Sequence, residues 1–337
     1  MKSKIIIWGL GGVGLHVARM VTQKKSVDLV GVINRAGNKV GRDPGELFGK
    51  EKIGIVVSGN ADEVLEKEAD VVLHHTHPRF EENVKQVSAA LMAKKNVIST
   101  AAFFYPWKTF PKQAKELDHL AKENGVTLLG GGIFPGFFHY LAAVLTGIVA
   151  RVDRIIIDYV DDLTTWPNPE MLKAMWGIGL PVDEFNKSDI ETNWMAVLYS
   201  EAIYFIADYL GWDLSEVRVA SECYTSEESI KSVCMEIEPG NVSAFKTSVE
   251  GIIDNKVVIA NNYYAGLQLE KFEEIPDLGC IISIEGRPPT GLAVKLDLEK
   301  WSILSSAAAV VNHIPQVINA PPGLVSMKDL PPPVPVE

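Results

Sequence analysis

Few cysteines, a shortage of positive charge and the lack of any long apolar run characterise this chain of 337 residues. Cys223, Cys234 and Cys280 lie far apart without C-x-x-C spacing, so the sequence predicts neither a disulfide framework nor a metal site. The apolar run near the N-terminus is broken by glycines and is far shorter than the ~20 residues that span a bilayer. We therefore expect no signal peptide, no transmembrane segment and a cytoplasmic protein.

The charge balance narrows the choice of partners. The chain carries 32 Lys and Arg against 43 Asp and Glu, a net charge of -11. Nucleic acids and anionic membrane surfaces require clustered positive charge, so we expect neither as a partner. A hydrophobic content of 47% with 22% charged residues is typical of a globular protein, and the length suits one large or two moderate domains.

Apolar runs alternate with amphipathic segments over the first 130 or so residues. A helix is predicted over residues 79–94, and another is predicted to end at Gly125. Nearly all-apolar strands between helices indicate a parallel sheet covered on both faces, so we expect a Rossmann-type doubly wound α/β unit. The predicted strands are residues 4–8, 27–33, 54–57, 69–76, 96–100 and 126–132.

The pattern changes after Ala150. Strand-like runs joined by short polar turns indicate antiparallel hairpins, and residues 194–211 read as a buried helix. We expect a second, α+β domain on a largely antiparallel sheet, which is also the expected homodimer surface. The predicted strands are residues 154–162, 231–239, 243–254, 256–267 and 280–286.

These patterns predict two domains. The dinucleotide-binding domain comprises residues 1–133 plus 300–337, and the substrate and dimerisation domain comprises residues 134–299. A helix is expected over residues 299–315, where Pro315 would end it. The proline-rich tail after it is expected to be extended and poorly ordered.

Gly9, Gly11 and Gly14 have G-x-G-x-x-G spacing between the first predicted strand and a helix. The first glycine permits a tight turn, the second lets the backbone approach a pyrophosphate, and the third lets helix pack closely on strand. The helix N-terminus then faces the phosphates. This context predicts dinucleotide binding, against the alternative that the glycines serve only a tight turn.

The end of the second strand predicts the choice of dinucleotide. An NAD-specific site places Asp or Glu about 20 residues past the glycines, but this chain has Asn34, Arg35 and Asn38. Arg35 could hold a 2′-phosphate through two hydrogen bonds, or it could be a solvated loop residue. NADP(H) is therefore the preferred cofactor, and NAD(H) stays compatible with the sequence.

Three histidines, His74, His75 and His77, lie at the carboxyl end of the fourth predicted strand. Histidines two apart share a face of an extended chain, which raises a metal site as an alternative, but no Cys, Asp or Glu lies between His74 and Arg79. We expect this loop to lie over the cofactor. The expected cofactor-binding residues are Gly9, Leu10, Gly11, Gly12, Val13, Asn34, Arg35, Asn38, His75, Thr76, His77, Thr100, Ala101, Phe134 and Pro135.

Several stretches together resemble the amine dehydrogenases related to 2,4-diaminopentanoate dehydrogenase, whose nucleotide domain is similar to that of dihydrodipicolinate reductase. The resemblance implies reversible reductive amination, in which a ketone and ammonia form an imine that NAD(P)H reduces. Small ketones or aldehydes, amines and ammonia are thus the implied partners. The resembling stretches are residues 40–49, 69–76, 161–179 and 307–331.

Two residues depart from the resemblance: Phe134, where the family has the Asn of an Asn-Pro-Gly-Phe stretch, and the residue at the position of the family's catalytic acid. Between Ser99 and Trp107 the chain has no carboxylate, histidine, cysteine or lysine. The family places a catalytic glutamate in a Thr-x-Glu-x-x-Tyr-Pro pattern there, and the matching position is Ala102, with Thr100, Tyr105 and Pro106 all in agreement. Three explanations stay open: an engineered variant that has lost its glutamate, an NADPH-dependent imine or carbonyl reductase that takes its proton elsewhere, or a non-catalytic NADPH-binding sensor.

Two other side chains could replace the missing acid. His139 has a pKa suited to proton exchange near neutrality, and Tyr105 is a second candidate donor. Each could instead be an ordinary packing residue. Aromatic side chains near the expected domain junction favour a small, mainly apolar ketone, although they could equally be core. The expected substrate-binding residues are Ala102, Phe138, His139, Trp166, Asn168, Met171 and Trp176.

Overall fold

A computed structural model describes residues 2–35, 37–77, 80–101, 103–188, 194–296 and 298–337. The chain forms two compact units. Unit 1 contains residues 1–137 and 303–337, and unit 2 contains residues 138–302. None of the described helices is long and apolar enough to cross a bilayer.

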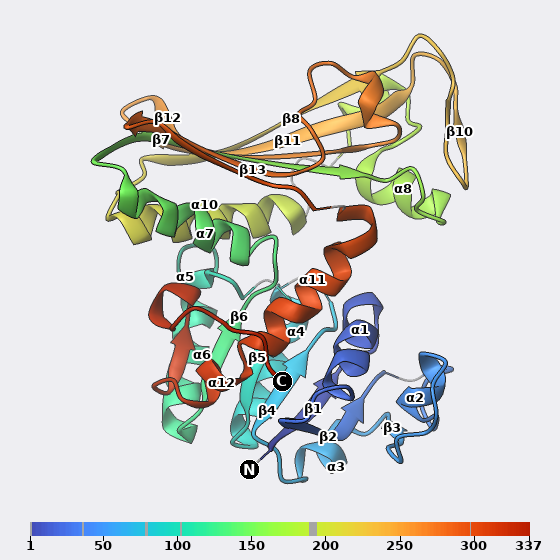
Figure 1. The fold of residues 1–337 in the computed structure, drawn as a ribbon, viewed down its shortest axis with the longest axis vertical. Coiled ribbons are helices and arrows are strands. Elements are labelled where there is room, and N and C mark those ends of the chain that lie inside the picture. Colours follow the sequence, from blue (N-terminus) through green and yellow to red (C-terminus); the bar gives the residue numbers. More distant parts are fainter. Residues whose placement is uncertain (1, 36, 78–79, 102, 189–193, 297) are drawn as a thin grey trace. The chain divides into compact units, whose positions relative to one another are not determined.

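Unit 1 is built on a seven-stranded sheet with the order β15-β6-β5-β4-β1-β2-β3 (Figure 1). Every neighbouring pair is parallel, which confirms the predicted Rossmann-type fold. Its strands are β1 (Ser3–Trp8), β2 (Val27–Ile33), β3 (Val57–Ser58), β4 (Val71–His74), β5 (Asn96–Ser99), β6 (Thr127–Gly130) and β15 (Gly323–Val325).

Helices follow the strands, as a doubly wound sheet requires. Helix α1 packs on β1 and β2, α4 packs on β5, and α12 packs on β5 and β6. The left-handed Gly125 ends α6, with φ +67, as predicted. The helices are α1 (Gly12–Val21), α2 (Pro44–Leu47), α3 (Ala61–Leu65), α4 (Phe80–Met92), α5 (Pro106–Thr109), α6 (Pro111–Asn124), α11 (Leu298–Asn312) and α12 (Ile314–Ile318).

The third strand was predicted too early. Residues 53–55 are not in a strand because their N–H groups donate to the carboxylate of Asp43. The strand begins at Val57, whose backbone pairs with Gly41 and Arg42. The predicted helix over residues 299–315 also ends early, at Asn312, and Pro315 lies in the first turn of the next helix.

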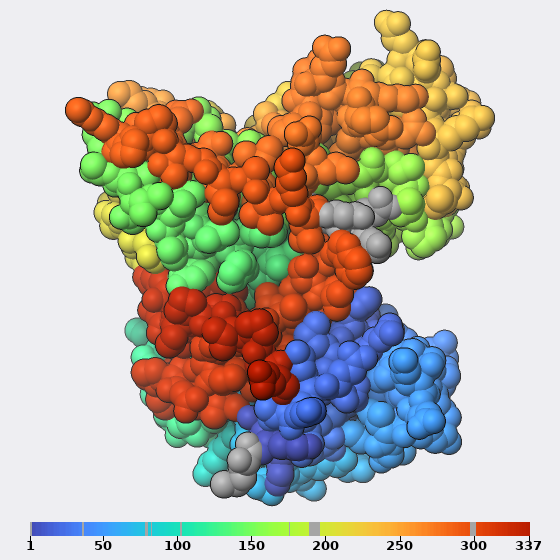
Figure 2. All heavy atoms as spheres, in the orientation of Figure 1, coloured from blue at the N-terminus to red at the C-terminus, as the bar shows by residue number. Residues whose placement is uncertain are grey.

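The proline-rich tail is extended, but the prediction that it is poorly ordered is wrong. The N–H of Val336 donates to Asn312 Oδ1 at 3.1 Å, and Val336 itself is buried. The carbonyl of Glu337 accepts the N–H of Ser26 at 2.9 Å. The end of the chain therefore lies against the N-terminal strands of unit 1 (Figure 2).

Unit 2 is built on a six-stranded sheet with the order β14-β13-β7-β12-β11-β8. Strands β7 and β12 are parallel and the other pairs are antiparallel, which confirms a largely antiparallel sheet. The strands are β7 (Arg151–Asp162), β8 (Glu216–Thr225), β11 (Val242–Ile253), β12 (Lys256–Gly266), β13 (Gly279–Arg287) and β14 (Thr290–Val294).

The helices of unit 2 include α7 (Phe137–Leu145) and α10 (Trp194–Leu210), which lie on one face of the sheet (Figure 1). We call this face the inner face. Helix α10 confirms the predicted buried helix. The predicted strand over residues 231–239 is instead a small hairpin of β9 (Ile230–Lys231) and β10 (Glu236–Ile237), because Ser232 and Met235 close a turn between them. Two short helices, α8 (Pro169–Trp176) and α9 (Val182–Phe185), follow β7.

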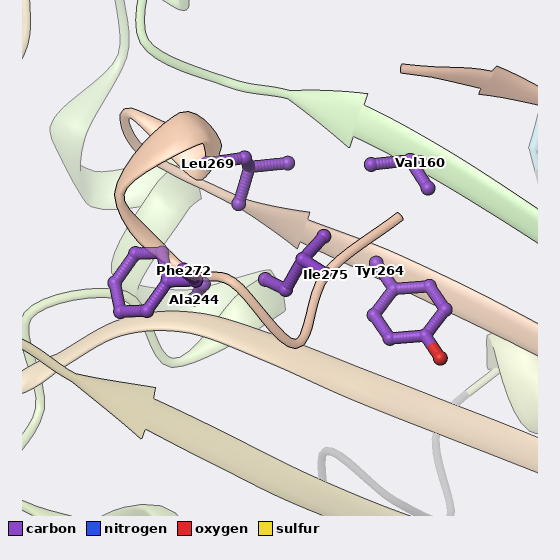
Figure 3. Packing of buried hydrophobic residues seen from close by; sticks show 6 residues of the cluster. All are labelled: Val160, Ala244, Tyr264, Leu269, Phe272 and Ile275. Carbon is purple, nitrogen blue, oxygen red and sulfur yellow. The ribbon is translucent and has the colours of Figure 1, made fainter. Parts of the chain in front are cut away.

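A hydrophobic cluster closes the opposite face at one end of the sheet (Figure 3). Val160 and Tyr264, which pair across β7 and β12, lie beneath the loop between β12 and β13. Burying this apolar surface fixes the loop on the sheet. The cluster consists of Val160, Ala244, Tyr264, Leu269, Phe272 and Ile275.

Candidate functional site

A cavity of about 650 Å³ opens at the carboxyl ends of β1, β2 and β4 in unit 1. This volume is within the usual range of small-molecule sites, about 300–1,000 Å³. We call it the glycine-turn cavity. It brings together nine of the predicted cofactor-binding residues: Gly9, Leu10, Gly11, Asn34, Arg35, Asn38, His75, Thr76 and His77.

The other predicted cofactor residues do not line this cavity. Gly12 and Val13 lie just behind it in the first turn of α1. Thr100 and Ala101 follow β5, and Phe134 and Pro135 follow β6. Ala102, the position of the expected glutamate, lies outside the described residues.

The three glycines of the turn have different roles. Gly9 has φ +98, and a Cβ there would collide with the backbone carbonyl of His75. A Cβ on Gly14 would collide with the carbonyl of Gly9. Gly11 has no heavy atom within 4 Å of a Cβ position, so its missing side chain leaves open space at the start of α1. That space suits an anionic group facing the helix N-terminus.

Asn34 and Lys39 hold the glycine turn from the side of β2. Asn34 Oδ1 accepts the N–H of Leu10 at 3.0 Å, and Lys39 Nζ donates to the carbonyl of Leu10. Arg35 is exposed at the same end of the cavity. Arg35 and Lys39 are the two cationic side chains at this end, and no carboxylate is among the described residues that line the cavity. This charge balance suits an anionic ligand.

Asp43 fixes the loop behind this end of the cavity. Its carboxylate accepts the N–H groups of Gly45, Ile53, Gly54 and Ile55 at 2.7–3.2 Å. Burial acts to raise the pKa of Asp43, but the four hydrogen bonds outweigh it and hold the pKa below its ordinary value. Asp43 lies in the stretch 40–49, which was noted in the sequence only because it resembles the amine dehydrogenase family.

His74 belongs to a buried polar network beneath the cavity. Its Nδ1 lies 2.9 Å from Ser99 Oγ, and its Nε2 lies 2.8 Å from Gln86 Oε1 and 3.0 Å from Thr76 Oγ1. Burial lowers the pKa of His74 to about 4, so the ring is neutral at pH 7. A neutral, fully bonded ring acts as a structural support for the Thr76 loop.

His75, which also lines the cavity, is different because one of its buried ring nitrogens has no partner among the described residues. Its Nδ1 lies 3.0 Å from Thr100 Oγ1, while Nε2 is buried and has no hydrogen-bond partner among the described residues. Burial lowers the pKa of His75 to about 3. A buried polar atom of this kind needs a partner, which a bound ligand can supply.

The histidines at the end of β4 were also weighed as ligands of a metal ion. In the described part of the chain, no three His, Cys, Asp or Glu side chains are arranged to hold a metal ion. Both ring nitrogens of His74 and the Nδ1 of His75 already have hydrogen-bond partners, in Ser99, Gln86 and Thr100.

The candidate donors lie in different units. Tyr105, in unit 1, is buried, and Lys328 Nζ lies 5.7 Å from its ring centre. His139, in unit 2, is fully buried on α7, and its Nε2 lies 2.9 Å from Asn261 Oδ1 on β12. Burial lowers the pKa of His139 to about 4, so the ring carries no proton to donate as an imidazolium at pH 7.

The other predicted substrate residues lie in unit 2. Phe138 is buried on α7, and the rings of Trp166 and Trp176 form an edge contact at 5.0 Å. Asn168 caps α8 by accepting the N–H of Met171 at 3.0 Å. Among the aromatics near the missing acid, Phe103 packs instead on Phe80 in the core of unit 1, 4.7 Å between ring centres.

Several lining residues were not predicted. Asn83 and Gln86 reach the cavity from α4, where they form part of the His74 network. They lie three apart in a helix that was described only by its apolar stripe. Polar residues at helical spacing just after three histidines were the available signal.

Comparison with known proteins identifies the family. A model of the 2,4-diaminopentanoate dehydrogenase C-terminal domain matches residues 137–337, more than half of the chain. The chain belongs to the 2,4-diaminopentanoate dehydrogenase family. A model of the dihydrodipicolinate reductase N-terminus matches residues 3–129, which include the glycine-turn cavity. Both matches agree with the resemblance read from the sequence.

Individual relatives support the same assignment. The 2,4-diaminopentanoate dehydrogenase of Acetoanaerobium sticklandii is 34% identical over 340 residues, covering 98% of this chain and 94% of the relative. An amine dehydrogenase of Streptomyces virginiae is 25% identical over 344 residues, covering 97% and 95%. The structure of an amine dehydrogenase from Mycobacterium smegmatis aligns with a TM-score of 0.81 at 26% identity, covering 99% and 97%.

A more distant structure shares the fold alone. A scyllo-inositol dehydrogenase from Lactobacillus casei aligns with a TM-score of 0.56 at 17% identity, covering 93% of this chain and 89% of that chain. Membership in the 2,4-diaminopentanoate dehydrogenase family makes the chain an oxidoreductase of the amine dehydrogenase type. Its nucleotide-binding dehydrogenase fold is one that takes NAD(P)(H).

Two glycine substitutions separate cofactor binding from folding. In Gly11→Val, the new side chain enters open space, so the melting temperature should stay unchanged while NADPH affinity falls. Overpacking of this kind costs about 1–3 kcal/mol, so the Kd should rise roughly 10- to 100-fold. Calorimetric titration with NADPH and a thermal melt measure the two effects.

Gly14→Ala is the matched comparison, because its methyl group would strike the backbone of Gly9. It should lower the melting temperature itself. Unchanged NADPH binding in Gly11→Val would contradict the placement of the cofactor in the glycine-turn cavity.

Proposed function

We propose that this protein is an NADP(H)-preferring amine dehydrogenase. It would convert a small ketone or aldehyde and ammonia to an amine, and the reverse reaction would be an oxidative deamination. The proposal depends on the glycine-turn cavity. This cavity is lined by the glycine turn, Arg35 and Lys39, and no carboxylate is among the described residues that line it. Family membership supplies the reaction class.

The proposed cofactor contacts follow from the chain's own groups. When bound, a reduced nicotinamide supplies the hydride. The N-terminus of α1 would hold the pyrophosphate over Gly11, and Arg35 would hold a 2′-phosphate by paired hydrogen bonds. His75 Nε2 would hydrogen-bond to the occupant of the cavity. Gly12, Val13, Thr100, Ala101, Phe134 and Pro135 stay proposed contacts outside the described cavity lining.

Reductive amination also requires a group that handles the proton of the reacting nitrogen. With Ala102 at the expected glutamate position, Tyr105 is the first proposed donor, and His139, which is neutral at pH 7, is the second. The proposed substrate contacts are Phe138, Trp166, Asn168, Met171 and Trp176. An imine or carbonyl reductase, and a non-catalytic NADPH sensor, stay the alternatives because both avoid the need for the glutamate.

We also propose a cytoplasmic homodimer formed by the outer face of the unit 2 sheet, which is the face opposite α7 and α10. Three free cysteines are consistent with a reducing compartment. The face carries a ladder in which Asn262 bridges Asp158 and Ser248, at 2.7 and 2.8 Å, beside the Lys246–Glu222 ion pair. Charges of both signs on one face can pair with a second copy across a two-fold axis.

Light scattering of the pure protein should give twice the chain mass.

The proposed NADP(H) preference predicts the effect of Arg35→Gln. Loss of a charge-assisted contact costs roughly 1.5–3 kcal/mol, so the KM for NADPH should rise about 10- to 100-fold while the KM for NADH changes little. Arg42→Gln is the control, since Arg42 is exposed nearby but is not among the residues lining the cavity. Equal effects on NADPH and NADH would count against a 2′-phosphate contact.

The reaction itself is tested by following NADPH absorbance with ammonium and cyclohexanone. We expect oxidation that requires both, and Ala102→Glu should raise its rate by about 10²–10⁴-fold, the usual contribution of general acid–base catalysis. Turnover of the ketone without ammonium would indicate a carbonyl reductase instead. Tight NADPH binding without turnover in either protein would favour the sensor.

A further inference from the structure

The inner face of the unit 2 sheet carries a buried acid that the proposed reaction does not yet use. Asp161 lies near the carboxyl end of β7 and is 9% exposed. The hydroxyl of Tyr263, on the neighbouring β12, donates a hydrogen bond to its carboxylate. Tyr159 lies two residues earlier on the same face of β7, directly opposite Tyr263.

Three tyrosine rings lie close enough to this carboxylate to be affected by its charge. The ring centres of Tyr159 and Tyr263 are 5.5 Å apart, and Tyr199 from α10 lies 5.9 Å from Tyr263. We call Asp161, Tyr159, Tyr199 and Tyr263 the Asp161 cluster. Each of the three tyrosines keeps a small exposed fraction of 4–6%, so the cluster is buried without being completely closed.

The phenols supply hydrogen bonds and ring faces but no positive charge. Burial first, and then the negative charge of Asp161, raise the pKa of Tyr159, Tyr199 and Tyr263 above the ordinary value for tyrosine. They therefore stay protonated at neutral pH. A carboxylate that accepts N–H groups, together with electron-rich ring faces, is the chemistry that recognises an ammonium group.

The cluster also lies next to the expected substrate residues in the chain. Strand β7 ends at Asp162, whose Oδ1 accepts the N–H of Thr164 at 2.7 Å, and the loop then leads through Trp166 and Asn168 into α8. Asp161 thus begins the stretch that carries Trp166, Asn168, Met171 and Trp176. The aromatic residues of this stretch predicted a mainly apolar substrate, and Asp161 was not among the expected substrate-binding residues.

We propose that the Asp161 cluster binds a protonated nitrogen of the substrate. The inference rests on the proposed amine dehydrogenase function and narrows it to substrates or products that carry an ammonium group at this point. That nitrogen is either the ammonia that the reaction consumes or a second amino group on the carbonyl substrate. Asp161 is the charge that holds it, and Tyr263 orients the carboxylate.

Calorimetric titration of the whole protein with NADP⁺ present tests the site through binding alone. Cyclohexylamine, which is a cation at pH 7, should bind at least tenfold more tightly than the neutral cyclohexanol. Asp161→Asn should weaken cyclohexylamine about 10- to 100-fold and leave cyclohexanol unchanged. Equal affinity of the two probes for the unmodified protein, or unchanged cyclohexylamine affinity in Asp161→Asn, overturns the proposal.

Two further variants keep the test specific. Asp153→Asn makes the same change on the same strand, but Asp153 is exposed and pairs with Arg151, so the affinity for cyclohexylamine should not change. Tyr263→Phe keeps the ring and removes the donor, and it should weaken cyclohexylamine by a smaller factor than Asp161→Asn. If Asp161→Asn does not fold, full cyclohexylamine affinity in Tyr263→Phe overturns the proposal.

Steady-state kinetics then distinguish the two sources of the nitrogen. If the cluster holds the reacting ammonia, Asp161→Asn raises the KM for ammonium with cyclohexanone as the ketone. If it holds a second amino group, the variant raises the KM for 4-aminocyclohexanone and leaves that for ammonium unchanged. Should the unmodified protein oxidise no NADPH with any ketone, the proposed reaction fails, while the calorimetric preference for the cation still decides the fate of the Asp161 cluster.

Discussion

The close approach of two backbone segments, at Gly9 and His75, determines the rest of the nucleotide site. A side chain on Gly9 would overlap the carbonyl of His75, and one on Gly14 would overlap Gly9 in turn. Only with both positions bare can α1 begin directly behind the turn, with its free N–H groups beside the space at Gly11. The hydrogen bonds from Asn34 and Lys39 then fix the turn in this position.

The two units use buried polar groups in different ways. In unit 1 the network around His74 satisfies its members with one another, and it supports the wall of the glycine-turn cavity. In unit 2, His139 on α7 is bonded to Asn261 on the inner face of the sheet, and Asp161 on the same face is bonded to Tyr263. Burying a polar group lowers the stability of the fold unless the group is hydrogen-bonded. Each of these buried groups therefore has a hydrogen-bond partner that holds it in place.

The strand–helix alternation of unit 1 could be predicted because each strand is an apolar run of its own and Gly125 ends its helix. Part of the cavity lining could be predicted where backbone geometry dictates the residue type, as at Gly9 and Gly11. Arg35 could be predicted because the end of the second strand has no Asp or Glu. Contacts between distant segments were not readable. The four N–H groups that converge on Asp43 displaced the third strand, and Asn312 and Ser26 hold a tail that composition alone marked as loose.

The Asp161 cluster could not be predicted from the sequence, because it too is formed by contacts between distant segments. Tyr159, Tyr199 and Tyr263 come from three elements spread over about a hundred residues, and only the register of β7 on β12 puts two of them opposite each other. Asp161 and Asp162 read in sequence as the polar end of a strand. In the structure they lie on opposite faces, so one acid is buried while the other caps a turn.

The last strand of unit 1, β15, pairs with β6, yet about 190 residues of chain separate them. During synthesis, unit 2 is therefore complete before the ribosome has produced the strand that finishes the sheet of unit 1. Pairing at such sequence distance is slow, since the loop between the partners must close first. The nascent chain thus carries an unfinished sheet edge at β6 until β15 has been made, and an unpaired strand edge of this kind is open to pairing with other chains.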